Sequence, residues 1–93
     1  MVDQNEAYQQ IERHREQIDE LDKQIVDLLN KRVSHSLVIR GLKPDANMGL
    51  YDPKREEEIF EKIDALNEGP YYNENLREIY ATILKVSKET PSV

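Results

Sequence analysis

Hydrophobic and polar residues follow a helical period along most of the chain, and glycine and proline divide that pattern into three segments. Residues 1–40 contain neither glycine nor proline, and breaks follow at Gly41–Gly49 and at Gly69-Pro70. Within each segment the apolar residues recur at intervals of three and four, and no segment shows the period of two that is typical of a strand. The sequence therefore predicts an all-α fold of three helices in a single domain over residues 1–93.

The first predicted helix runs from about Gln4 to about Leu42 and is very long. At about 1.5 Å per residue it would measure roughly 55–60 Å, whereas a compact monomer of this size has a diameter of roughly 30 Å. An uncovered amphipathic helix of that length would expose an extended apolar surface. We therefore expect a homodimer in which a second copy covers the helix.

The other two predicted helices are shorter. Asp52 is a capping residue followed by Pro53 at the first helical position, and Asn67–Pro70 ends the second helix. The third helix is predicted to begin near Asn73–Asn75. Residues with helical spacing give each of these helices a packing face: Ile59, Phe60, Ile63 and Leu66 on the second, and Leu76, Ile79, Tyr80, Ile83, Leu84 and Ser87 on the third.

The composition argues against several classes of protein. The 93 residues include 13 Lys+Arg and 19 Asp+Glu, and a net charge of −6 is unlike that of a nucleic-acid-binding protein. Cysteine is absent and there are two histidines, so we expect no disulfide scaffold, thiolate nucleophile or metal centre. Neither a membrane span nor a signal peptide is evident, which favours a cytoplasmic protein.

Charged residues lie on the apolar stripe of the first helix. Alternating steps of four and three residues from Ile11 trace one face of this helix. Half of the positions on this face are aliphatic, and the others are polar or charged: Arg15, Asp22, Arg32, Ser36 and Lys43. Long basic side chains can reach water from such positions, and Asp22 could pair with a cation of a neighbouring helix. Three cations on one stripe of an acidic protein instead favour a site for a small anion, because buried positive charge needs a counter-charge.

The spacing of these cations assigns them to two sites. Arg15 and Arg32 are 17 residues apart, or roughly 25 Å along a helix, which is too far for one small anion to bridge. Arg32 and Lys43 are about 16 Å apart, within reach of two extended side chains. In an antiparallel dimer, Arg15 of one chain would complete the site of its partner.

The start of the second predicted helix adds further candidates. Asp52, Arg55 and Glu56 lie within little more than one turn, at a helix end that favours anions. An ordinary cap with solvated charges is the alternative interpretation. On the third helix, Ser87 lies on the packing face.

Together these residues resemble the all-helical class of chorismate mutases. The run Arg15–Asp22, followed by aliphatic residues, Arg32 and Lys43, is similar to the first helix of that family, and Tyr51–Glu57 is similar to its Asp-x-x-Arg-Glu signature. The resemblance covers roughly residues 8–90. It implies an intertwined homodimer that converts chorismate to prephenate in phenylalanine and tyrosine biosynthesis, with no cofactor.

The resemblance also implies roles for individual residues. Arg15, donated by the partner chain, and Arg32 would bind the two carboxylates of chorismate, and Lys43 would reach the ether oxygen and a carboxylate. On the second helix, Asp52 and Glu56 would contact the ring hydroxyl, and Arg55 would add positive potential. On the third helix, Ser87 would line the end of the site that binds a carboxylate.

The end of the third helix departs from the family's pattern. The family usually carries a Gln or Glu four residues after the serine of this helix, as a second donor to the ether oxygen, and this chain has Pro91 there. Lys88, one turn earlier, is a candidate substitute. The alternatives are that Lys43 works with help from water or backbone, or that the activity is weak. In addition, Pro44 disfavours a helical backbone at Lys43, so we expect Lys43 to lie on a loop.

Two other functions remain open at this point. One is an isochorismate pyruvate lyase, which has the same fold and a similar anion pocket. The other is a non-catalytic dimer that binds an aromatic-pathway metabolite or regulates a partner enzyme of the shikimate pathway. The Asp-x-x-Arg-Glu signature favours the mutase, whereas Pro91 supports the non-catalytic alternative.

Overall fold

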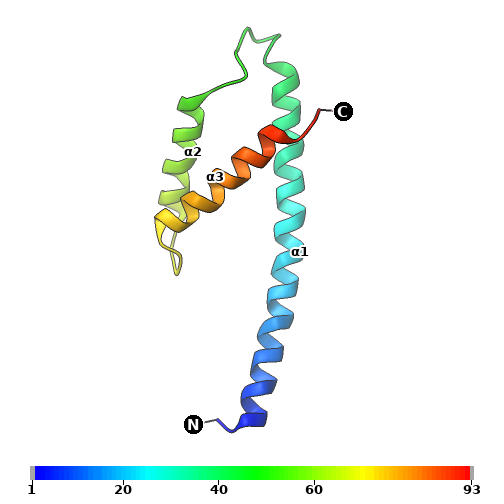
Figure 1. Cartoon of the computed structure of the whole chain (residues 1–93), viewed down its shortest axis with the longest axis vertical. Coiled ribbons are helices and arrows are strands. Elements are labelled where there is room, and N and C mark those ends of the chain that lie inside the picture. The colour runs from blue at the N-terminus through cyan, green and yellow to red at the C-terminus, as the bar shows by residue number, and fades with distance from the viewer. Residues whose placement is uncertain (1, 93) are drawn as a thin grey trace. The chain divides into compact units, whose positions relative to one another are not determined.

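The computed structural model describes residues 2–92. They form three helices and, over this range, no strand: α1 (Gln4–Leu42), α2 (Pro53–Leu66) and α3 (Asn73–Glu89) (Figure 1). The predicted all-α class, the long first helix and the helix bounds are confirmed. None of the described helices is long and apolar enough to cross a membrane. The chain divides into two compact units, Met1–His35 and Ser36–Val93.

In the first unit, α1 is stabilised by interactions within the helix. The Asp3 carboxylate caps its start by accepting a hydrogen bond from the Glu6 amide at 2.7 Å. Ion pairs that each join neighbouring turns follow along the helix: Glu12–Arg15 at 2.8 Å, Glu20–Lys23 at 3.2 Å and Asp27–Lys31 at 2.8 Å. Pairs of this kind each stabilise a helix by about 0.2–0.5 kcal/mol.

The apolar side chains of this unit are exposed in the single chain. Between 39% and 61% of each remains accessible along the stripe that runs through Ile11, Ile18, Leu21, Ile25, Leu28 and Leu29. Among residues 2–92 no side chain is buried. The stripe is the extended apolar surface that the length of the first helix predicted.

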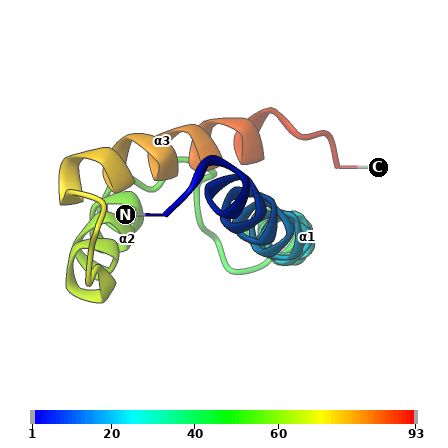
Figure 2. The same cartoon turned by 90° about the horizontal axis from the view of Figure 1, so that it is seen from below.

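In the second unit, α2 and α3 pack against each other and are joined by the loop 67–72 (Figures 1 and 2). Most of the predicted packing faces are half-buried, whereas Leu66 and Ile79 remain exposed in the single chain. The predicted cap of α2 is confirmed, since the Asp52 carboxylate accepts a hydrogen bond from the Arg55 amide at 3.0 Å.

Asn67 organises the loop between α2 and α3. Its side-chain amide donates to the Tyr71 carbonyl at 2.8 Å and to Asn73 Oδ1 at 2.7 Å, and its Oδ1 accepts from the Gly69 amide at 2.9 Å. Gly69 has a φ of 77°, a backbone conformation that glycine adopts readily. This loop fixes the end of the α2–α3 pair that lies opposite the candidate site.

Candidate active site

Two of the predicted site residues meet between α2 and α3. Glu56 lies in the first turn of α2 and Lys88 in the last turn of α3, and the Lys88 ammonium forms a close ion pair with Glu56 Oε1. The Glu56 side chain is 27% exposed and that of Lys88 is 58% exposed. The ammonium also lies 6.0 Å from the centre of the Tyr51 ring, within the range of a cation–π interaction. Both charges of the pair therefore remain accessible to a ligand.

An open hollow of about 310 Å³ lies beside this ion pair. Charged groups and apolar side chains share its lining, which consists of Glu56, Phe60, Ala81, Leu84, Lys85 and Lys88. A largely apolar wall with a few convergent charged groups is typical of a site for a small organic ligand. The ammonium groups of Lys85 and Lys88 at this hollow favour the binding of an anion.

Asp52 and Arg55 make their contacts within α2. The carboxylate of Asp52 caps the helix, and the guanidinium of Arg55 lies 3.7 Å from Glu58 Oε2. The capping alternative therefore accounts for the contacts of Asp52 in this structure. Arg55 is exposed, so its charge contributes to the positive potential at the start of α2.

Lys43 lies directly after α1, in the turn that leads to α2, as predicted. Its ammonium donates a hydrogen bond to the Leu50 carbonyl at 3.0 Å and so closes the loop that precedes Asp52. Asn47 within this loop has a φ of 57°, a left-handed conformation that asparagine tolerates better than most residues. Because a carboxylate is a stronger partner for an ammonium than a neutral carbonyl, Lys43 is able to exchange Leu50 for an anionic ligand.

Ser87 is half-buried beside Lys88 on α3. Its hydroxyl donates to the Ile83 carbonyl at 2.8 Å, and its own carbonyl accepts a hydrogen bond from Arg40 Nη2 at 2.8 Å. No motif or spacing in the sequence singles out Arg40. This residue lies off the stripe that contains Lys43, and a basic residue in the last turn of a helix is common because it complements the helix dipole.

Arg15 and Arg32 belong to the first unit. Arg15 is exposed and pairs with Glu12, and Arg32 is half-buried. The structure thus brings Glu56 and Lys88 together at one end of the α2–α3 pair, and Ser87 precedes Lys88 on α3. The contribution of Arg15 and Arg32 to the same site remains a prediction.

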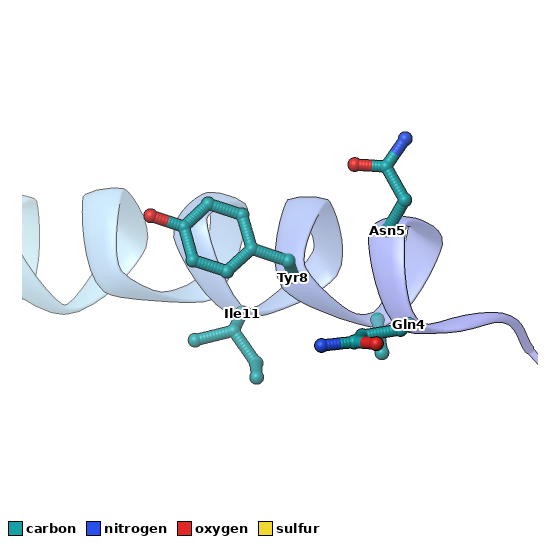
Figure 3. A pocket seen from close by; sticks show the side chains of 5 residues that line it. Gln4, Asn5, Tyr8 and Ile11 are labelled. Carbon is teal, nitrogen blue, oxygen red and sulfur yellow. The ribbon is translucent and has the colours of Figure 1, made fainter.

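A second hollow runs along the first two turns of α1, with Tyr8 and Ile11 beside it (Figure 3). Its lining comes from one helix and carries no charge: Gln4, Asn5, Ala7, Tyr8 and Ile11. It therefore lacks the groups that would hold an anion. Within residues 2–92, no three His, Asp or Glu side chains gather in a way that would hold a metal ion.

Comparison with known proteins identifies relatives for most of the chain. The family described as "Chorismate mutase type II" matches residues 14–91. Two bifunctional chorismate mutase/prephenate dehydratases are similar: that of Aquifex aeolicus (strain VF5) is 40% identical over 74 residues, and that of Neisseria gonorrhoeae (strain ATCC 700825 / FA 1090) is 34% identical over 71. The matches cover 75% and 76% of this chain but 20% and 19% of the relatives, so the chain spans about a fifth of their length.

Two solved structures of chorismate mutase from Thermus thermophilus have a similar fold. Form II aligns with a TM-score of 0.82 and 32% identity, over 86% of this chain and 91% of that chain. Form I aligns with a TM-score of 0.80 and 33% identity, over 84% and 98%. The segment that matches the family contains every predicted site residue, from Arg15 to Lys88.

Proposed function

This chain belongs to the chorismate mutase type II family, and on that premise we propose that it is an isomerase that converts chorismate to prephenate. The observation that carries the proposal is the match to this family over residues 14–91, the segment that holds all eight predicted site residues. The similarity to the Thermus thermophilus chorismate mutases, which extends over most of both chains, supports it.

The chemistry requires little of the protein beyond shape and charge. In this rearrangement an ether C–O bond breaks while a C–C bond forms within the same molecule, so neither a nucleophile nor a proton transfer is needed. The enzyme can hold the substrate in its reactive conformation and stabilise the negative charge that develops on the ether oxygen. Fixed cations are the groups suited to both tasks.

Lys43 is the proposed donor to the ether oxygen. In the structure its ammonium is held by one neutral carbonyl of its own loop, which leaves it able to turn to a ligand. Arg15 and Arg32 are proposed to bind the two carboxylates, with Arg15 supplied by a second copy of the chain. The exposed apolar stripe of α1 supports that second copy, because an intertwined homodimer would cover it.

The second helix and the third complete the proposed site. Asp52 and Glu56 would meet the ring hydroxyl, and Arg55 would add positive potential. The family's Gln or Glu that donates to the ether oxygen is replaced by Pro91 in this chain. Lys88 is proposed to donate in its place, because its ammonium lies at the hollow and pairs with Glu56. Ser87 would line the carboxylate end.

A non-catalytic metabolite-binding dimer is the second candidate function, and the proline at position 91 is the observation that favours it.

The proposal is tested by following the loss of chorismate absorbance with purified protein and identifying the product by mass. We expect prephenate, and we expect Lys43→Ala to lower kcat by at least about a hundredfold, since removing a donor to a developing oxyanion has an effect of that size. Lys62→Ala, which removes an exposed lysine of α2, is the matched control. Light scattering on the same samples should give the mass of a dimer.

The outcomes separate the candidates. Release of pyruvate would identify a lyase, and tight binding of a dicarboxylate without turnover would identify a non-catalytic module. A near-normal kcat in Lys43→Ala would exclude the proposed role of that residue. A monomeric mass would exclude the donation of Arg15 between chains.

A further inference from the structure

Arg40 joins the end of α1 to the end of α3 within the second unit. Its Nη1 donates to the Thr90 carbonyl at 2.7 Å and to Ser92 Oγ at 3.0 Å, and its Nη2 donates to the Ser87 carbonyl at 2.8 Å. Arg40 is half-buried, and its acceptors lie within residues 87–92, where α3 ends (Figure 1). The guanidinium thus binds two backbone carbonyls and one side-chain hydroxyl of one short stretch of the chain.

The carbonyls that Arg40 binds lie at a helix end that has few other donors. The last carbonyls of an α-helix have no partner within the helix, and they form the negative end of its dipole. The Thr90 amide reaches the Ser87 carbonyl at 3.3 Å, and Pro91 has no amide hydrogen to offer. A planar guanidinium suits this place because it binds several oxygens in a fixed geometry.

Lys88 lies between the two carbonyls that Arg40 binds, and its ammonium pairs with Glu56 of α2. We propose that Arg40 is a positioning residue of the anion site: by fixing the last turn of α3, it keeps Lys88 beside Glu56. This inference rests on the proposed function for its effect on turnover. Arg40 acts through its neighbours and does not itself touch the reacting atoms.

The test compares Arg40→Ala with Arg77→Ala in the full chain. Arg77 ties α3 to α2 at the other end of the pair, and its guanidinium lies over the ring of Phe60 but pairs with neither Glu56 nor Lys88. Its loss therefore removes a contact between the helices and leaves the charged groups of the site in place. For Arg40→Ala we expect kcat with chorismate to fall about tenfold while KM rises less than about threefold, because a displaced Lys88 stabilises the charge that develops on the ether oxygen less well. Arg77→Ala should leave both constants unchanged. Arg40→Lys should lie between, since one ammonium cannot satisfy three fixed acceptors.

A double variant separates positioning from a general structural role. If Arg40 acts through Lys88, then Arg40→Ala should lower kcat no further in a chain that already carries Lys88→Ala. The same fold-decrease of kcat in both backgrounds would overturn the inference. An unchanged kcat in Arg40→Ala alone would also overturn it.

Amide hydrogen exchange tests the geometry without any turnover. In Arg40→Ala the amides of residues 86–90 should exchange faster than in the unaltered chain, whereas in Arg77→Ala they should not. Unchanged exchange over these residues would overturn the positioning role. If the unaltered protein does not convert chorismate, the proposed function fails, and the exchange experiment still decides whether Arg40 fixes the end of α3.

Discussion

Two ion pairs join α2 to α3, and they differ in kind. Near the loop 67–72, Arg77 binds Asp64 with three hydrogen bonds of 2.6–3.1 Å, and its guanidinium lies 5.6 Å from the centre of the Phe60 ring. At the other end, Lys88 pairs with Glu56 through a single ammonium. The first pair presents a planar fork to both carboxylate oxygens, and the second joins a point charge on a flexible stem to one oxygen.

This difference separates a contact that holds the helices from one that is available to a ligand. The hydrogen bonds from Arg77 lower the pKa of the Asp64 carboxyl, with partial desolvation acting against them, and the same bonds raise the pKa of Arg77. At the Lys88 end the ammonium can rotate towards the adjoining hollow without giving up a fixed geometry. One helix pair therefore carries a structural end and a proposed functional end.

Within the α2–α3 pair, the largest expected effect comes from neutralising the carboxylate of Glu56. Glu56→Gln should lower kcat/KM for chorismate by about ten- to a hundredfold, the effect of losing a hydrogen bond to a charged group. Its melting temperature should change little, because a pair formed by one accessible ammonium and one carboxylate oxygen contributes little to stability. Steady-state kinetics and thermal melts followed by circular dichroism measure the two quantities.

Asp64→Asn is the matched control for this experiment. It should lower the melting temperature by a few degrees and leave kcat/KM within about twofold, because most effects at a distance from the site are small. If both variants lose activity equally, or both lose stability equally, the two ends do not differ in the way their geometry indicates.

A smaller effect is expected from exchanging the two cations. Lys88→Arg would place a rigid fork beside Glu56, so KM for chorismate should rise about three- to tenfold as the carboxylate is held more firmly. Arg77→Lys should instead lower the melting temperature and leave KM unchanged. An unaltered KM in Lys88→Arg would show that substrate binding does not depend on rotation of the Lys88 ammonium towards the hollow.

The fold could be predicted almost entirely from local signals. Asp52 followed by Pro53 marks the start of α2, and the absence of glycine and proline before Gly41 allows one uninterrupted helix, so the helix bounds were correct. Leu66 and Ile79 lie on the predicted packing faces and yet are exposed in the single chain. Periodicity shows which face of a helix is apolar, but whether that face is covered depends on what lies opposite it.

The candidate site was predictable only in part. The resemblance and the break at Pro91 singled out Glu56 and Lys88, and the structure places these two in contact. Arg40 gave no such signal, because two of its three acceptors are backbone carbonyls about 50 residues further along the chain, and a carbonyl is present whatever the sequence. Contacts from a side chain to distant backbone leave no pattern of residue types to detect.

The smallest expected effect is the pH dependence of the structural end. A carboxyl whose pKa is lowered in the folded state stabilises the protein above its ordinary value of 3.8, and this contribution is lost as the pH falls through the lowered pKa. The raised pKa of Arg77 keeps its guanidinium charged throughout this range. The difference in melting temperature between the unaltered chain and Asp64→Asn should therefore be constant near neutral pH and shrink as the pH falls below 3.8 and through the lowered pKa. Thermal melts of Glu56→Gln over the same pH range serve as the comparison. A difference in melting temperature for Asp64→Asn that does not change with pH would contradict the assignment of the Asp64–Arg77 pair as the structural end of the α2–α3 pair.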